Sequence, residues 1–340
     1  MKAIVYKATG GSDVLSLAER AMPAPGPGEV RVKVAVSGVN PTDWKSRGGA
    51  RPGEPLGFPE VVPNQDGSGV IDATGPGVDD SRTGERVWLW EAAWQRADGT
   101  AQEYVTLPAS QAVPLPDEAS FDLGASLGIP ALTAHRCLTV ADGGPERLRP
   151  GALSGQVVLV AGGAGAVGHA AIQLARWSGA NVVTTVSGEE KERLARAAGA
   201  HHVVNYTEPG AAARIRRAAP DGVNIIVEVA PAVNADLDKE VIAPSGTIAV
   251  YATDGGREVT LHASSLMRAN VRYQFVLVYT VPQPAKRSAV SDVAAAVADG
   301  ALPVGEAAGL PLIRFTLDRT ADAHDAVQNG AIGKVLIDVG

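Results

Sequence analysis

Cysteine is almost missing from this 340-residue chain, and no long apolar run occurs in it. Cys137 is the only cysteine, which excludes an internal disulfide and any site built from clustered thiolates. No stretch reaches the roughly 18 consecutive apolar residues that a membrane-spanning helix requires. We therefore expect no membrane partner and a location in the reducing cytoplasm.

Positively charged residues are also fewer than negatively charged ones. The chain carries 30 Lys and Arg against 37 Asp and Glu, a formal net charge of −7. It lacks the broad positive field that attracts a phosphate backbone, so nucleic acid is not an expected partner. Its 45% hydrophobic and 20% charged residues are typical of a globular protein, and its length favours two domains.

The first 127 residues predict a small, mostly antiparallel β domain. Turns rich in Pro and Gly separate the short apolar segments KAIVYKA, EVRVKVAVSGV, SGVIDATG, ERVWLW and AQEYVTLP. Around Phe121 the apolar residues adopt helical spacing, interrupted by Pro130. We expect a domain junction here, between residues 127 and 128.

The middle of the chain alternates strand and helix. Continuous apolar strands such as QVVLVAG, ANVVTTV, VNIIVEVA and GTIAVYA are separated by amphipathic helices. This pattern predicts a doubly wound α/β domain over residues 128–283, with a parallel sheet covered on both faces. The tail loses the alternation, so we expect residues 284–340 to return to the first domain.

The segment VVLVAGGAGAVGHAAIQLA contains the pattern G-x-G-x-x-G between a predicted strand and a predicted helix. Gly163 is expected to permit the turn, Gly165 to let the backbone approach a pyrophosphate, and Gly168 to allow close helix packing. The alternative is a glycine-rich turn without a ligand. We predict a Rossmann dinucleotide loop made of Gly163, Ala164, Gly165, Ala166, Val167 and Gly168.

The end of the next strand indicates which dinucleotide binds. An acidic residue there would bind the ribose hydroxyl of NAD, but the strand ends in Ser187. Lys191 and Arg193 follow, and Tyr206 ends the next strand, so a cation and hydroxyls can converge on a 2′-phosphate. A solvated helix face is the alternative for the two cations. NADPH is the predicted cofactor, with Ser187, Lys191 and Tyr206 at its phosphate.

Taken together, these segments resemble the zeta-crystallin-like quinone oxidoreductases of the medium-chain dehydrogenase/reductase superfamily. The resemblance covers nearly the whole chain, through KAIVYKATGGSDVL, SGVNPTDW, QDGSGVIDATGPGV, GTAQEYV, LGIPALTAHR and GKVLIDVG. It implies a GroES-like catalytic domain formed by both ends of the chain and a Rossmann domain inserted between them. It also implies an active site between the domains and a homodimer or homotetramer.

Zinc alcohol dehydrogenases, which are related to this family, hold their catalytic metal with a cysteine and a His-Glu pair. In this sequence those positions are Asn40, Gln65 and Asp66. Asn and Gln are not usual zinc ligands, and the six histidines show no H-E-x-x-H spacing. We predict no metal.

The resemblance also suggests catalytic residues. Asn40 and Asp43 match positions near the nicotinamide and the substrate, although Asn40 could instead only cap the helix that follows it. Lys45 stands where several relatives have a tyrosine, so that proton donor is not transferable. Lys45, Tyr251 or a water molecule could replace it.

The tryptophans are the candidates for a substrate wall. Trp88, Trp90 and Trp94 lie within seven residues, and Trp44 ends the segment SGVNPTDW that contains Asn40. Aromatic rings could stack on a planar acceptor. The alternative is that Trp88 and Trp90, two residues apart on a strand, both face the core.

Three further positions come from the resemblance alone. Val250 and Tyr251 would contact the nicotinamide end of the cofactor, and Lys334 would approach the cofactor from the other domain. The apolar segment YQFVLVYT is predicted to pair with its counterpart across a dimer, because an exposed apolar edge strand invites aggregation. A strand inside the monomer is the alternative.

The sequence thus predicts NADPH-dependent reduction of a quinone or another α,β-unsaturated carbonyl compound, without zinc. One alternative is an enone or enal double-bond reductase that serves a single pathway. Another, of a different class, is a protein that binds NADPH without physiological turnover. The acceptor itself is not predicted.

Overall fold

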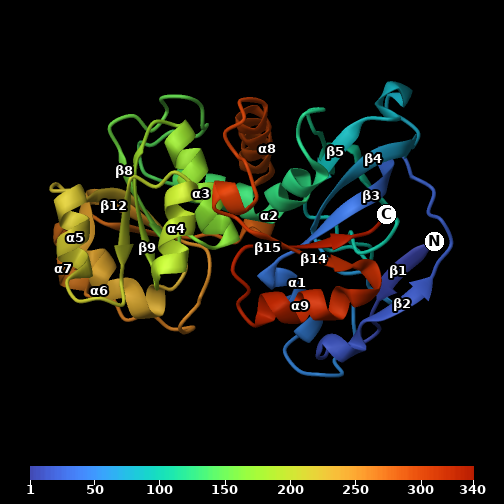
Figure 1. The fold of residues 1–340 in the computed structure, drawn as a ribbon, viewed down its shortest axis with the longest axis horizontal. Coiled ribbons are helices and arrows are strands. Elements are labelled where there is room, and N and C mark those ends of the chain that lie inside the picture. The colour runs from blue at the N-terminus through green and yellow to red at the C-terminus, as the bar shows by residue number, and fades with distance from the viewer. The chain divides into compact units, whose positions relative to one another are not determined.

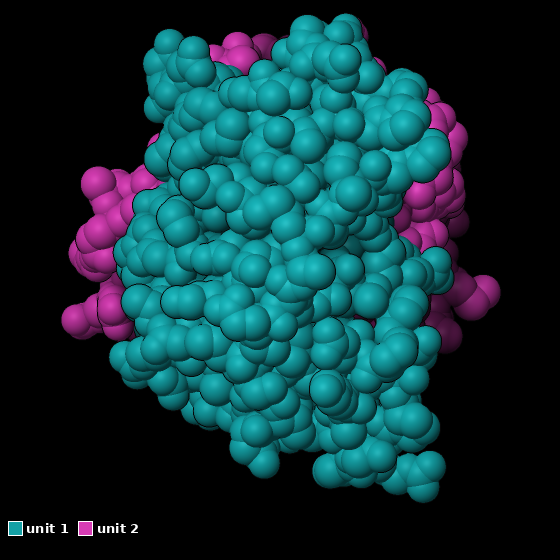
Figure 2. Space-filling view, turned by 90° about the vertical axis from the view of Figure 1, so that its right-hand side faces the viewer, with its two compact units in different colours: residues 1–129, 312–340 teal, residues 130–311 magenta.

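The structure, a computed structural model, describes residues 1–340 and separates into two compact units (Figure 2). Unit 1 consists of Met1–Ile129 and Leu312–Gly340, and unit 2 of Pro130–Pro311. The first junction lies two residues beyond the predicted one. The second lies at residues 311 and 312, whereas the sequence placed it at 283 and 284.

Helix α8 (Gln283–Ala298) explains the shifted boundary. Its buried Asp292 pairs with His135 at 2.8 Å, and it accepts hydrogen bonds from Arg147 Nε at 2.7 Å and from the Leu148 N–H at 2.8 Å. All three partners belong to unit 2. Residues 284–311 therefore belong to unit 2, because the helix packs there through a buried charge that sequence periodicity does not reveal.

Unit 1 is built on a seven-stranded sheet in the order β14-β15-β3-β4-β5-β7, with β6 also paired to β3. Adjacent strands in this sheet run antiparallel, except for the pair β14 and β15, which is parallel. Figure 1 shows the C-terminal strands, in red, beside the blue β3. The strands are β1 (Lys2–Val5), β2 (Ser16–Glu19), β3 (Glu29–Val39), β4 (Asp66–Thr74), β5 (Arg86–Leu89), β6 (Tyr104–Pro108), β7 (Ala112–Pro114), β14 (Leu312–Thr316) and β15 (Lys334–Asp338).

The helices that begin in unit 1 are few, as predicted: α1 (Pro41–Gly48), α2 (Phe121–Leu138) and α9 (Thr320–Gln328). Helix α2 contains Pro130 in its interior and continues into unit 2. No helix of the chain combines the length and the apolar character that crossing a membrane requires.

Unit 2 is a doubly wound domain with a six-stranded parallel sheet in the order β10-β9-β8-β11-β12-β13. The strands are β8 (Val157–Ala161), β9 (Asn181–Val186), β10 (His202–Asn205), β11 (Val223–Glu228), β12 (Ile242–Val250) and β13 (Arg272–Phe275). The predicted α/β fold class is confirmed. The strand order reverses between β8 and β11, and ligands of such sheets bind beyond the carboxyl ends at that point.

Helices cover both faces of this sheet, with α3 and α4 on one side and α5 and α6 on the other (Figure 1). The helices are α3 (Ala166–Trp177), α4 (Glu189–Ala197), α5 (Ala211–Ala218), α6 (Pro231–Val241), α7 (Ala263–Arg268) and α8. Val183, Ile226 and Ile248 form part of the apolar core that the layers enclose. Sequence periodicity missed the short α7.

The predicted strand YQFVLVYT is shorter in the structure. Only Arg272–Phe275 is extended, as the edge strand β13, and Val278–Thr280 forms a turn of 3₁₀ helix. The strand pairs with β12 on one side only, and Phe275 and Leu277 beside the open edge are 62% and 51% exposed. Strand β13 is thus not internal to the monomer sheet.

Candidate functional site

Four glycines in the loop between β8 and α3 have different structural roles. Gly162 has a φ of 72°, so it makes the turn that the sequence assigned to Gly163. A Cβ atom on Gly163 would lie 2.1 Å from Thr184 Oγ1, so this residue is glycine because β9 packs against it. The doubled glycine in VAGGAG was the available signal for Gly162.

The two later glycines behave differently from each other. A Cβ atom on Gly168 would lie 2.3 Å from the Gly162 carbonyl oxygen, so this residue is glycine because α3 packs closely against the turn. Gly165 is exposed, and a Cβ atom there would meet no protein atom nearer than 3.5 Å. Its missing side chain is therefore not required by packing inside the chain. It leaves open the space where a ligand phosphate could approach the backbone.

Gly165 is also the N-cap residue of α3, and no side chain caps the helix. The first N–H groups of a helix have no partner within it and carry the positive end of the helix dipole. Ala166 and Val167 are half-buried here, and Ala164 is buried. An open, uncapped helix start of this kind fits the pyrophosphate of a dinucleotide.

Ser187 and Lys191 meet at the tip of β9. The Lys191 ammonium donates a hydrogen bond to Ser187 Oγ at 3.0 Å, whereas Arg193 pairs with Glu306. Tyr206 is exposed, and its N–H donates to the Val186 carbonyl at 3.0 Å. Ser187, Lys191 and the backbone of Tyr206 thus lie at the carboxyl end of β9, where Ser187 stands in place of a carboxylate. Arg193 is directed elsewhere.

The end of β12 carries the predicted nicotinamide contacts. The side chain of Val250 lies in the apolar core, so any contact with a ligand falls to its main chain. Tyr251 is half-buried, and its N–H donates to the Glu228 carbonyl at 3.0 Å. Burial first, then nearby acidic groups, raise the pKa of Tyr251 well above its usual value. The phenol therefore stays protonated and able to donate.

In unit 1, strand register places three polar residues on one face of the sheet. Strand β15 pairs antiparallel with β3 at Val335 and Val39, so Lys334 and Asn40 occupy the next opposing positions. Strand β4 pairs with β3 at Asp66 and Gly38. Because side chains alternate along a strand, Asn40, Asp66 and Lys334 lie on the same side.

Hydrogen bonds join these three side chains, all of which are buried. Asn40 Nδ2 donates to Asp66 Oδ2 at 2.7 Å, and Lys334 Nζ donates to Asn40 Oδ1 at 2.8 Å. The Lys334 ammonium is 3.6 Å from Asp66 Oδ2. The other Asp66 oxygen accepts from the Ile129 N–H at 2.9 Å. We call Asn40, Asp66 and Lys334 the amide triad.

Asp43 lies beside the amide triad on α1. Its buried carboxylate accepts a hydrogen bond from the Asn40 N–H at 2.7 Å and caps the helix. Burial is the main reason that the pKa of Asp43 is raised to about 8. Asn40 occupies the N-cap position, but its side chain is turned to Asp66 and Lys334. The predicted capping role therefore coexists with these contacts, since α1 begins in a capping box between Asn40 and Asp43.

The donors at these positions do not suit a catalytic zinc ion. Gln65 Oε1 accepts from the Ala93 N–H at 3.1 Å, and both oxygens of Asp66 are hydrogen-bonded. The Lys334 ammonium occupies the same group and would repel a second cation. The structure, which describes the whole chain, has no cluster of three or more His, Cys, Asp or Glu side chains able to hold a metal.

The four tryptophans predicted to contact the substrate lie in different environments. Trp88 has no accessible surface, so it belongs to the core of unit 1 and offers no ring face for stacking. This corrects its predicted substrate role, because β5 is buried on both sides: Val87 and Leu89 have no accessible surface either. Trp90 is also buried, whereas Trp44 and Trp94 are half-buried. The exposed Lys45 ammonium lies 5.6 Å from the centre of a Trp44 ring.

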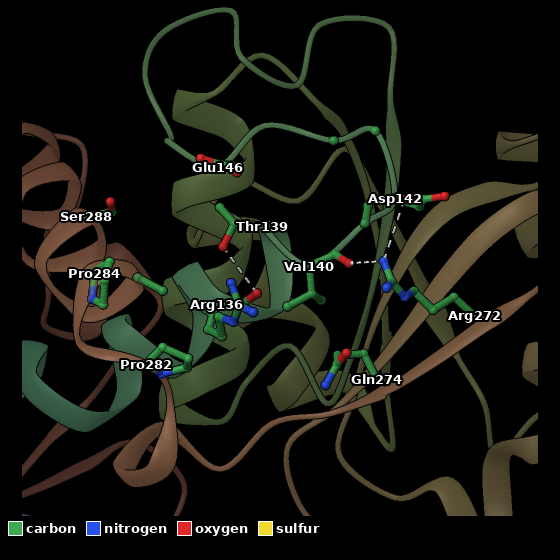
Figure 3. A pocket seen from close by; sticks show the side chains of 14 residues that line it. Arg136, Thr139, Val140, Asp142, Glu146, Arg272, Gln274, Pro282, Pro284 and Ser288 are labelled. Carbon is green, nitrogen blue, oxygen red and sulfur yellow. Dashed lines mark hydrogen bonds and ion pairs between the residues drawn. The ribbon is translucent and has the colours of Figure 1, made fainter.

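A cavity of about 580 Å³ in unit 2 lies away from the glycine loop. Figure 3 shows it between the end of α2, the loop that follows, β13 and the start of α8. The Arg272 guanidinium at its wall donates to the Val140 carbonyl at 3.3 Å. None of the predicted site residues lines this cavity. Arg272 is the first residue of β13, so it lies at the amino ends of the parallel strands, away from their carboxyl ends.

Comparison with known proteins adds the family. The family model for the alcohol dehydrogenase GroES-like domain matches residues 26–117, and that for the zinc-binding dehydrogenase domain matches residues 166–296. A rat quinone oxidoreductase is 33% identical over 261 residues, which span 76% of this chain and 75% of that protein. The chain belongs to the quinone oxidoreductase family of the medium-chain dehydrogenases/reductases.

Two solved structures are similar to this family member over its whole length. One, described as an NAD-dependent alcohol dehydrogenase, is 30% identical with a TM-score of 0.86 and full coverage of both chains. The other, a mycobacterial protein complexed with NADPH, is 28% identical with a TM-score of 0.80 and 99% coverage of both chains. Their descriptions name different nicotinamide cofactors. For this chain, the residues at the tip of β9 are therefore the structural indication of which one binds.

Sequence reasoning missed two functional candidates in this family member. Gly162 makes the turn of the nucleotide loop, and Asp66 holds the Asn40 amide. Asp66 had entered only as a residue at a zinc-ligand position. Its partners come from two other strands, β3 and β15, so no local pattern marked it.

Proposed function

We propose that this chain is an NADPH-dependent reductase that transfers a hydride to quinones or other α,β-unsaturated carbonyl compounds without zinc. The observation that carries the proposal is the open glycine loop before α3, followed by a β9 tip with Ser187 and Lys191 and no carboxylate. The loop fits the pyrophosphate, and the tip fits a 2′-phosphate. Similarity to quinone oxidoreductases supports the acceptor class.

The amide triad supports reduction of an activated acceptor rather than oxidation of a simple alcohol. Without a Lewis acid, an unactivated alcohol or carbonyl is difficult to polarise, whereas quinones and enones are already electron-poor. NADPH supplies the hydride. The chain must bind the cofactor, orient the acceptor against it and keep water out of the site. We assign Asn40 to the acceptor oxygen and leave Lys45, Tyr251 or water as the proton source.

The first experiment is a nicotinamide oxidation assay with NADPH and NADH against quinones, enones and aldehydes, with and without chelator. Fast NADPH oxidation that resists chelation is expected, and the better acceptor class identifies the physiological type. Tight NADPH binding without turnover of any acceptor would contradict the proposal and favour a binding role. Activity that disappears with chelator and returns with zinc would contradict the zinc-free part.

Lys191 and Arg193 provide a matched pair for the cofactor. Lys191→Ala should raise the KM for NADPH by about 10-fold or more and leave that for NADH unchanged, because it removes one charge-assisted bond to the 2′-phosphate. Arg193→Ala removes an equal charge that pairs with Glu306, so both constants should stay the same. Equal effects of the two variants would indicate only a general charge effect.

A further inference from the structure

Lys334 is the most unexpected member of the amide triad, because its side chain is only 1% exposed. A buried ammonium is costly unless it is paired and hydrogen-bonded. Here the Asn40 carbonyl oxygen is its hydrogen-bond acceptor and Asp66 its counter-charge. Burial lowers the pKa of Lys334, and the neighbouring Asp66 and Asp43 act against that shift by favouring the ammonium, which lies directly behind the amide of Asn40.

The two contacts fix which way the amide faces. Its oxygen accepts from Lys334, and one of its two N–H bonds donates to Asp66. A flipped amide would turn its oxygen toward the Asp66 carboxylate and its NH₂ toward the ammonium, so both contacts would become repulsive. One N–H bond of Asn40 remains for another partner. Asn40 is thus set up as a donor.

We propose that Lys334 is a positioning residue that holds Asn40 as a hydrogen-bond donor to the acceptor oxygen and strengthens that donor through its charge. The inference rests on the proposed function, and it gives Lys334 a task within unit 1 instead of the predicted contact with the cofactor. Withdrawal of electron density at the amide oxygen makes the remaining N–H a better donor. Negative charge develops on the acceptor oxygen as hydride adds, so such a donor favours the transition state over the ground state.

Gly38 is glycine mainly because the backbone of α2 packs against it, and its missing side chain also leaves room for the lysine. A Cβ atom on Gly38 would lie 3.1 Å from Lys334 Cε and 2.1 Å from the Ala125 carbonyl oxygen. Gly38 lies on the same sheet face as Asn40, two positions earlier on β3. The sheet thus leaves out a side chain where the lysine stem has to pass.

The test compares Lys334→Met with the double variant Asp66→Asn/Lys334→Met. The single variant leaves the Asp66 carboxylate buried without its counter-charge and should lose stability. The double variant removes both charges and should regain much of that stability. In both variants kcat should fall by roughly 10- to 100-fold, somewhat less than the loss of a whole oxyanion donor, with little change in the acceptor KM.

Three controls separate positioning from other roles. Lys33→Met, on the exposed side of β3, should leave kcat unchanged. Lys334→Met combined with Asn40→Ala should be no slower than Asn40→Ala alone, because both act through one amide. The dissociation constant for NADPH should stay unchanged in Lys334→Met. A large loss of NADPH affinity would overturn the proposal and indicate a cofactor contact.

An NMR measurement tests the positioning without catalysis. With ¹⁵N-labelled asparagine, the Asn40 side-chain NH₂ signals should shift, and their exchange with water should speed up, in Lys334→Met. If the wild type is active but the double variant keeps full kcat and an unchanged Asn40 signal, the role of Lys334 is contradicted. The proposed function is then unaffected. A wild type that turns over no acceptor would contradict the proposed function, and the NMR comparison would still decide whether Lys334 holds the amide.

Discussion

The carboxyl group of Asp43 is buried near a second acidic side chain, that of Asp66. Its oxygen accepts from the Asn40 N–H, which favours the charged form, but burial outweighs this and raises the pKa to about 8. The Lys334 ammonium acts in the opposite direction. The native chain therefore holds a proton on Asp43 over a pH range in which an exposed aspartate has lost it.

This difference predicts how stability depends on pH. Between the ordinary pKa of 3.8 and about 8 the native chain binds a proton that the unfolded chain has released, so the free energy of unfolding falls as pH rises. Asp43 can contribute at most about 1.4 kcal/mol per pH unit to this slope. Asp43→Asn should flatten it, which urea unfolding at several pH values would measure. An unchanged slope would mean that Asp43 is ionised in the native chain.

At the scale of the element, the loop between β8 and α3 separates glycines that serve packing from one that leaves space for a ligand. Gly168→Ala places a methyl group against the Gly162 carbonyl oxygen and should cost about 1–3 kcal/mol of stability. Gly165→Ala should leave the thermal unfolding midpoint nearly unchanged and weaken NADPH binding about 10-fold, as calorimetric titration would show. Equal NADPH affinity in Gly165→Ala and the wild type would exclude a phosphate at this position.

Local patterns in the sequence predicted most of the elements and the position of this loop, but they missed the short α7 and the turn residue Gly162. Apolar runs and turn residues predicted the strands of both units, and β3 matches its predicted segment residue for residue. The amide triad could not be predicted in the same way, since Lys334 and Asn40 are 294 residues apart and meet only through strand register. The boundary at residue 312 depended on the buried contacts of Asp292, which periodicity does not encode.

At the scale of the whole molecule, the open edge of β13 remains the reason to expect self-association. We propose a dimer in which this edge pairs with its counterpart, covering Phe275 and Leu277. Phe275→Asp should raise the dimer dissociation constant by at least about 30-fold, equivalent to about 2 kcal/mol. Light scattering after size exclusion would measure it.

Met22→Asp is the matched control, since Met22 is an exposed apolar residue of unit 1 that lies outside any strand. It should leave the assembly unchanged. A Phe275→Asp variant that stays dimeric would place the interface elsewhere on the molecule.

Strand β15 lies beside β3 in unit 1, although the ribosome makes all of unit 2 between them. During synthesis, all of unit 2 is therefore made while unit 1 still lacks the strand that carries Lys334. Until β15 is made, Asp66 lacks its cationic partner and the Asn40 amide oxygen lacks its hydrogen bond from Lys334. The residues of the nucleotide loop are thus synthesised before the amide triad can be complete.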